Sequence, residues 1–137
     1  SAADVLAANS ALGIFPEGTR SKRMEKPFLL PGKTGIARLA ASFPRAPVIP
    51  IALVGTRNMM APQKDKFPKV WLPVQVNYGK KITWIDWLGS AEGGGMTAKD
   101  VEELSTLDDH EIKSAIAKLY RKFTDQLMQS ISSLGAP

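Results

Sequence analysis

The chain has no cysteine and one histidine, His110, and these shortages close several classes of chemistry to it. Without thiols it forms no disulfide, has no cysteine nucleophile and binds no metal through thiolates. A single imidazole also argues against a zinc cluster. The sequence therefore predicts no metal site, and its chemistry has to come from oxygen and nitrogen groups.

Long hydrophobic runs are also missing. No segment approaches the roughly 18 to 20 apolar residues of a membrane-spanning helix, and the start Ser1-Ala2-Ala3-Asp4 is unlike a signal peptide. The chain has 137 residues, of which 44% are hydrophobic and 23% charged. Such a chain can bury a core, so we expect one globular domain or a large part of one.

Positive charge gathers in the middle of the chain. From Arg20 to Lys81 there are thirteen Lys or Arg against two acids, whereas from Ile82 onward there are five against nine. A basic region of this size attracts phosphates of nucleic acid, of anionic lipid or of small substrates. Charge alone does not choose among these ligands, and a solvated surface without a ligand is equally compatible with it.

Apolar patterning predicts an α/β protein with few strands. Capping boxes at Thr97 with Asp100 and at Thr106 with Asp109 indicate the last two helix starts. The second of these helices carries an apolar stripe that runs from Ile112 to Ile131. The helices are expected at 2–9, 33–42, about 97–104 and 107–133, the strands at 12–15, 48–54 and 70–78, a loop at 59–69, and either strand or loop at 82–87.

A charged turn, Phe15 to Ser21, follows the first expected strand, where open α/β sheets place their ligands. Arg20 offers a planar fork of donors that suits phosphate, Thr19 adds a hydroxyl, and the backbone at Gly18 can approach an anion closely. Glu17 fits less well, because a carboxylate repels phosphate unless it pairs with a base or accepts a substrate hydroxyl. The alternative is a plain surface turn with a Glu17–Arg20 ion pair.

This turn, Phe15-Pro16-Glu17-Gly18-Thr19-Arg20-Ser21, and the later run Val48-Ile49-Pro50-Ile51-Ala52 resemble the third and fourth blocks of the glycerolipid acyltransferase family. That family includes the lysophosphatidic acid and glycerol-3-phosphate acyltransferases. The segment Lys33 to Ala40 is similar to the helix that the family has between these blocks. The resemblance implies a glycerol-3-phosphate acyltransferase-like α/β fold, with a mixed, largely parallel sheet flanked by helices. Residues 1–137 would form the C-terminal half of that domain.

The activity that the resemblance implies is transfer of a fatty acyl group from acyl-CoA or acyl carrier protein to lysophosphatidic acid, with no bound cofactor. Family members use a His-x-x-x-x-Asp motif, whose histidine is the general base and whose aspartate orients it. In this chain the fifth residue after His110 is Ala115. The resemblance therefore implies that the catalytic His and Asp lie upstream of Ser1 and that this chain alone is inactive.

The resemblance also assigns site residues. It implies an acceptor site in the first block, with Arg20 most directly on the phosphate, and a pocket shaped by both blocks. The substrate-binding residues would be Glu17, Gly18, Thr19, Arg20 and Ser21. The pocket-shaping residues would be Phe15, Pro16, Lys33, Val48, Ile49, Pro50 and Ile51.

The implied partners are a lysophospholipid acceptor, an acyl donor, the upstream half of the domain and a membrane. The location would be the cytoplasmic face of the cell membrane, reached peripherally or through an upstream anchor. The segment Lys64 to Lys69, with Phe67 and Met59-Met60, could rest on a membrane or be an ordinary solvated loop. Trp71, Tyr78 and Trp84 are expected in the core, so no nucleic acid is predicted as a partner. The rival hypothesis is a non-catalytic module that binds phosphate or anionic membranes.

Overall fold

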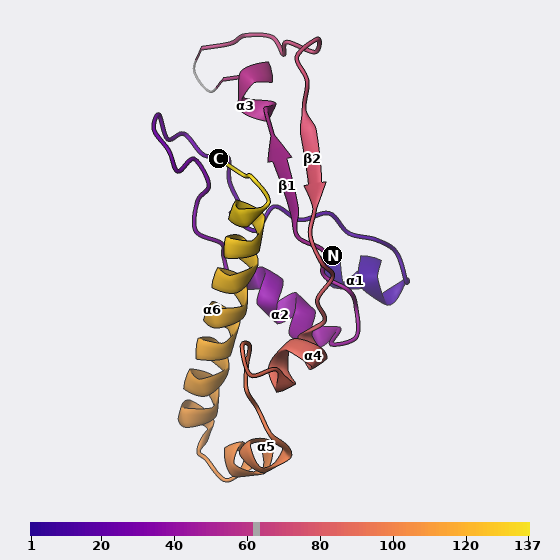
Figure 1. The fold of residues 1–137 in the computed structure, drawn as a ribbon. Helices are drawn as coiled ribbons and strands as arrows, with labels where there is room; N and C mark the ends of the chain where they lie inside the picture. Colours follow the sequence, from indigo (N-terminus) through magenta and orange to yellow (C-terminus); the bar gives the residue numbers. More distant parts are fainter. Residues whose placement is uncertain (62–63) are drawn as a thin grey trace.

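The computed structural model describes residues 1–61 and 64–137, which form a helical body and a hairpin that projects from it (Figure 1). The fold mixes helices with a small sheet, and none of the described helices is long and apolar enough to cross a bilayer. The helices are α1 Ala2–Ala7, α2 Gly35–Ser42, α3 Thr56–Met59, α4 Trp84–Gly89, α5 Ala98–Ser105 and α6 Asp109–Ser133, and the strands are β1 Ile51–Val54 and β2 Gln75–Tyr78.

The two described strands run antiparallel, in contrast to the largely parallel sheet that the sequence suggested. Ile51 lies opposite Tyr78 and Leu53 opposite Val76. An isolated antiparallel bridge between Val48 and Ile82 lies beyond Pro50, and β1 begins directly after this proline. Because proline has no amide hydrogen to donate, it interrupts the ladder at this point.

The strand expected at 12–15 is wrong, since these residues join no strand ladder in the described part of the chain. A strand needs a neighbouring strand to satisfy its backbone groups. The described strand β1 pairs with β2, so it does not pair with residues 12–15. The strand expected at 70–78 begins only at Gln75, because a turn in which the Leu72 amide donates to the Lys69 carbonyl (3.1 Å) precedes it. The loop expected at 59–69 includes residues 62–63, which lie outside the described residues.

One face of the hairpin is open. The run 48–54 was expected to be buried on both faces, yet only Ala52 and Pro50 of this run are buried, and Ile51 and Leu53 are exposed. We call Ile51, Leu53, Val76 and Tyr78 the outer sheet face, because their positions in the register put them on the same side. The opposite side faces α6, where the Asn77 side-chain amide donates to the Leu134 carbonyl (2.7 Å).

Most of the segment 82–87 is a helix start, although Ile82 still pairs with Val48 in the isolated bridge and α4 begins at Trp84. Thr83 caps α4, its hydroxyl accepting from the Asp86 amide (3.3 Å) and donating to the Asp86 carboxylate (2.8 Å). Trp84 and Trp87 are three residues apart, so in a helix both face α6. The Thr-x-x-Asp pattern that marks other helix starts is present here as well.

The last two helices lie at Ala98–Ser105 and Asp109–Ser133, where about 97–104 and 107–133 were expected. Thr97 forms the expected capping box with Asp100. The box expected at Thr106 is wrong, because Thr106 ends α5 and Asp108 caps α6 by accepting from the Glu111 amide (2.8 Å). The helices expected at 2–9 and 33–42 are confirmed as α1 and α2.

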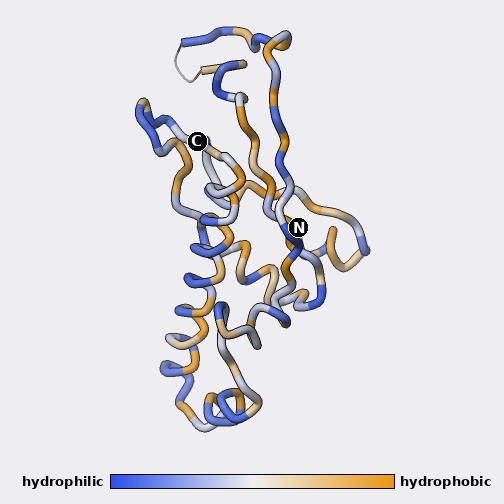
Figure 2. The backbone as a smooth tube through the Cα atoms, in the orientation of Figure 1, coloured by the Kyte–Doolittle hydropathy of each residue, from blue (hydrophilic) through white to orange (hydrophobic). Residues whose placement is uncertain are grey.

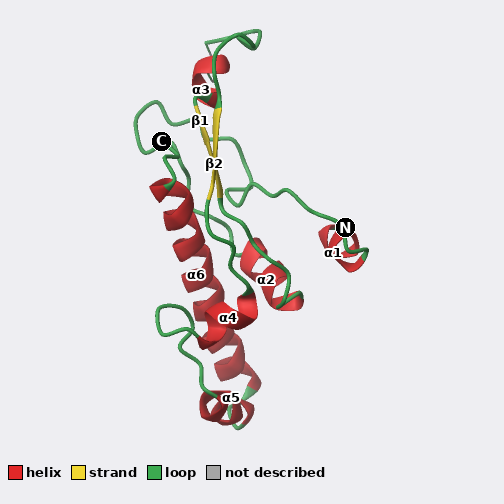
Figure 3. Cartoon of the chain, turned by 45° about the vertical axis from the view of Figure 1, so that its right-hand side comes forward, coloured by secondary structure: helices red, strands yellow, loops and turns green. Residues whose placement is uncertain are grey.

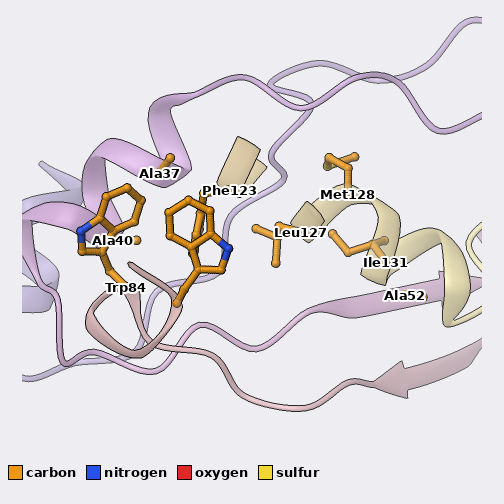
Figure 4. Packing of buried hydrophobic residues seen from close by; sticks show 9 residues of the cluster. Ala37, Ala40, Ala52, Trp84, Phe123, Leu127, Met128 and Ile131 are labelled. Atoms are coloured by element: carbon orange, nitrogen blue, oxygen red, sulfur yellow. The ribbon is translucent and has the colours of Figure 1, made fainter. Parts of the chain in front are cut away.

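The core lies between α2, α4 and the C-terminal half of α6, and it is aromatic at its centre (Figure 4). Phe123 is 1% exposed, and its ring meets Trp87 edge to face at 5.1 Å and Trp84 at 5.3 Å between centroids. The methyl groups of Ala37 and Ala40 bring α2 close to this cluster. Of the three aromatics expected in the core, only Trp84 is buried, whereas Trp71 and Tyr78 are 75% and 69% exposed.

Truncation of the central ring tests this core. Phe123→Ala is expected to lower the free energy of unfolding by about 3 to 5 kcal/mol, because it leaves a cavity between α4 and α6. Phe67→Ala is the matched control, since Phe67 is 81% exposed, and its change should stay within about 0.5 kcal/mol. Urea unfolding followed by tryptophan fluorescence measures both, and equal losses would contradict the assignment.

The α5 capping box predicts a pH dependence. The Thr97 amide, and then the Thr97 hydroxyl, donate to the Asp100 carboxylate and lower its pKa below the usual 3.8. A group whose pKa is lower in the folded state stabilises the fold above its unfolded pKa, and this contribution is lost as the pH falls through the folded value. Asp100→Asn should therefore flatten part of the fall in stability below about pH 4. Glu102→Gln on the same helix is the control, and an equal flattening in both variants would contradict the prediction.

Candidate functional site

The turn Phe15 to Arg20 is fastened to the start of α2 by backbone hydrogen bonds. The Gly18 amide donates to the Phe15 carbonyl (3.0 Å), and Gly18 has a φ of +69°, which favours glycine. The Lys33 amide donates to the Pro16 carbonyl (2.8 Å). The turn and the first residues before α2 therefore lie side by side, although no strand leads into the turn.

Glu17 holds this arrangement from inside. The Leu30 amide donates to Glu17 Oε2 at 2.7 Å, across thirteen residues of chain. Glu17 and Leu30 are both half-buried. No ion pair joins Glu17 to Arg20 among the described residues, so the plain surface turn with that pair is not what the structure contains. The carboxylate is a structural clamp, and sequence reasoning missed its partner Leu30.

The turn carries one exposed cation, Arg20, and a second cation, Lys33, lies over its glycine. Arg20 and Thr19 are exposed on the turn. The side chain of Lys33 lies over Gly18, where a Cβ would be 3.0 Å from Lys33 Nζ. Thr34 at the start of α2 makes no side-chain cap, and the first turn of α2 has no acidic residue. Uncapped amides at a helix N-terminus favour anions, so this turn has the groups that bind a phosphate.

The core sets the position of Lys33 through Gly32. The Arg121 guanidinium of α6 donates to the Gly32 carbonyl (2.9 Å). A Cβ at Gly32 would be 2.8 Å from Cγ2 of Thr124 and from Cγ of Met128, both in α6. Such distances leave no room for a side chain, so the backbone before α2 rests directly on α6.

The second block has mainly a structural place. Val48 and Ile82 exchange two backbone hydrogen bonds, each amide donating to the carbonyl of the other residue. The Pro50 carbonyl accepts from the Gly79 amide (2.8 Å). Pro50 is buried, whereas Ile49 and Ile51 are exposed. Among the described residues no hydrogen bond or ion pair joins this block to the turn. Phe15 is exposed, and the Ser21 hydroxyl accepts from the Arg23 amide (3.3 Å).

A second basic loop flanks the turn and contacts α3. The Arg57 guanidinium lies 4.0 Å from the centroid of the Phe28 ring and donates to the Arg23 carbonyl. Arg23 in turn donates to the Pro27 carbonyl (2.9 Å), which shapes the loop from 23 to 27. The loop that follows the candidate turn is thus in contact with α3.

The histidine of this sequence lies apart from the candidate turn. His110, the one histidine of the sequence, is exposed in the first turn of α6, and that end of α6 is remote from the loop between α1 and α2 (Figure 1). Within the described residues no three His, Cys, Asp or Glu side chains gather as a metal site would require. The groups on this turn are of the kind that bind anions.

Comparison with known proteins agrees with the resemblance in the sequence. Residues 1–54 match the acyltransferase family model. A 1-acyl-sn-glycerol-3-phosphate acyltransferase from Cocos nucifera is 39% identical over 83 residues, which cover 61% of this chain and 25% of that protein. The matched part thus spans about a quarter of that relative, and no solved structure matches significantly. The matched residues are thus similar to acyltransferases.

Proposed function

We propose that this chain supplies the acceptor-phosphate site of an acyltransferase that acylates lysophosphatidic acid, using acyl-CoA or acyl carrier protein as the donor. The observation that carries the proposal is the turn at Gly18, where Arg20 is exposed and the Lys33 ammonium lies close to the backbone. Two cations and an uncapped helix start suit a phosphate monoester. The similarity of residues 1–54 to acyltransferases gives this anion site its reaction class.

The clamp role of Glu17 removes the main objection to phosphate binding. A free carboxylate on this turn would repel the ligand, but Glu17 accepts from the Leu30 amide and is half-buried. Its charge is thereby held on the inner side of the turn, while Arg20 and Thr19 stay available outside. Ser21 and the pocket-shaping residues would then act mainly through backbone placement.

The reaction needs a general base, and this sequence has no His-x-x-x-x-Asp motif. In acyl transfer a base takes the proton of the acceptor hydroxyl, the oxygen attacks the thioester carbonyl, and the thiolate leaves. We propose that the histidine and aspartate come from another part of the whole protein, which packs on the outer sheet face. Ile51, Leu53, Val76 and Tyr78 form an exposed apolar surface there, as expected of an interface. The isolated chain would bind the acceptor weakly and catalyse nothing.

A second function is favoured by the missing His-x-x-x-x-Asp motif. A chain with cations and no base works equally well as a non-catalytic module that binds phosphate or anionic membranes. The two functions differ in ligand selectivity. An acceptor site should prefer glycerol 3-phosphate over generic polyanions, whereas a charge-only module should bind any polyanion in a salt-sensitive way.

Removal of Arg20 tests the proposed site. Arg20→Ala should weaken glycerol 3-phosphate binding about 10- to 100-fold, since hydrogen bonds to charged groups contribute about 1.5 to 3 kcal/mol. Arg45→Ala removes the same charge from an exposed position after α2 and should have little effect. Titrations of the 137-residue chain followed by NMR shifts measure both. Equal losses would favour the charge-only module, and turnover of acyl-CoA that disappears in Arg20→Ala would place a base in this chain.

Substitution of Glu17 separates its clamp role from contact with the ligand. Glu17→Ala leaves the half-buried Leu30 amide without an acceptor, so we expect a loss of about 1 to 3 kcal/mol in the free energy of unfolding. Glu17→Gln keeps an acceptor oxygen and removes a negative charge, so it should stay stable and bind glycerol 3-phosphate at least as tightly. Glu25→Ala, at an exposed position, is the control for urea unfolding. Weaker binding by a stable Glu17→Gln would show instead that the carboxylate contacts the acceptor.

A further inference from the structure

The end of the hairpin carries exposed apolar side chains that nothing in the described chain covers. We call residues 60–61 and 64–74, between α3 and β2, the hairpin tip. Phe67 is 81%, Trp71 75% and Val70 72% exposed, and Met60 and Val74 are exposed as well. The hairpin tip projects beyond β1 and β2, away from α2 and α6 (Figure 1), and both hydrophobic and hydrophilic segments meet there (Figure 2).

Local hydrogen bonds give the hairpin tip a defined shape. The Lys69 amide donates to the Met59 carbonyl (2.7 Å) and closes its base. The Ala61 amide donates to the Asp65 carboxylate (2.9 Å), and the Lys69 ammonium lies 3.2 Å from the same carboxylate. The one acid of the hairpin tip is thereby neutralised within the loop. Phe67 and Trp71 are exposed in this segment, which the bond between Lys69 and Met59 closes.

The charges of the hairpin tip complement an anionic surface. Lys64 and Lys66 are exposed and form no ion pair among the described residues, and they flank Phe67 along the chain. Lysine beside aromatic side chains is typical of segments that lie in the interface of a bilayer, with rings at headgroup depth and cations on anionic lipids. The aliphatic Met60, Val70 and Val74 fit acyl chains, whereas nucleic acid bases would use the rings alone.

We propose that the hairpin tip docks this chain on an anionic lipid membrane, with Phe67 and Trp71 inserted and Lys64 and Lys66 on lipid phosphates. Arg57 of α3, which precedes the hairpin tip in the chain, contacts the loop from Arg23 to Phe28. Docking in this way would bring this loop toward the membrane, and with it the candidate turn that precedes the loop in the chain. Only this last consequence rests on the proposed function, because the docking surface uses other residues.

Vesicle binding by the 137-residue chain tests the proposal. Vesicles of phosphatidylcholine with phosphatidylglycerol should bind the chain, and Phe67→Ala with Trp71→Ala should weaken binding at least about 10-fold, because removing two inserted rings takes away most of the buried apolar area. Lys64→Gln with Lys66→Gln should remove most of the preference over pure phosphatidylcholine. Tyr78→Ala and the pair Lys80→Gln with Lys81→Gln, all at exposed positions outside the hairpin tip, are the matched controls and should bind like the unsubstituted chain.

Tryptophan emission gives a readout that needs no variant. Trp84 and Trp87 are buried and Trp71 is exposed, so vesicles should shift the emission of Trp71 to shorter wavelength. An unshifted emission, or losses in the Tyr78 control equal to those in the hairpin tip variants, would overturn the proposal. Binding of single-stranded RNA that competes with vesicles and depends on Trp71 would overturn it in favour of a nucleic acid site.

A competition experiment keeps this proposal apart from the proposed function. Under the proposed function glycerol 3-phosphate binds the turn at Arg20 without vesicles, so its titration in their absence tests that site alone. It should not displace the chain from phosphatidylglycerol vesicles. Displacement would show that the turn, and not the hairpin tip, holds the membrane, and it would overturn the docking proposal while supporting the phosphate site.

Discussion

The packing of Phe123 against Trp84 and Trp87 is the contact on which the rest of the chain depends. These rings hold α4 on α6, and the small Ala37 and Ala40 let α2 approach the same cluster (Figures 3 and 4). Because α2 is fixed, the backbone just before it is fixed as well, with Gly32 pressed on α6. The Lys33 amide of that backbone donates to the Pro16 carbonyl and so holds the candidate turn. The candidate turn is therefore positioned by an aromatic core that takes no part in it.

Elements that depend on local signals could be predicted from the sequence. The alanine-rich α2 and the Thr97 capping box of α5 are examples, since a period of 3.6 and a cap are both written within a few residues. Strands need a partner that the local sequence does not name. Leu12 to Phe15 looks like a strand and has no partner, whereas Ile82 to Trp87 looks extended because tryptophan and isoleucine favour sheets. The Thr83 cap and the ring of Phe123 override that preference.

The candidate site divides in the same way. Arg20, Thr19 and Gly18 follow from a short motif, and their place on one turn needs little tertiary structure. The clamp between Glu17 and Leu30 joins residues thirteen apart through a hydrogen bond that no local pattern encodes. The exposure of side chains is the property that the sequence predicts least well. Trp71 and Tyr78 are residue types that are common in cores, and they lie outside the core. An apolar run predicts that its side chains will be buried, but it does not tell which other part of a protein buries them.

The distribution of charge gives these surfaces a common direction. The thirteen cations between Arg20 and Lys81 lie on the segment that includes the candidate turn and the hairpin tip, while most of the nine acids after Ile82 lie on α5 and the start of α6, at the opposite end (Figure 1). An anionic surface attracts one end of such a molecule and repels the other, so it orients the chain before any contact forms. The end that arrives first is the one with cations for phosphate. Charge separation would thus orient the chain at long range. The contact of Arg57 with Phe28 and the exposed side chains of the hairpin tip act only at short range.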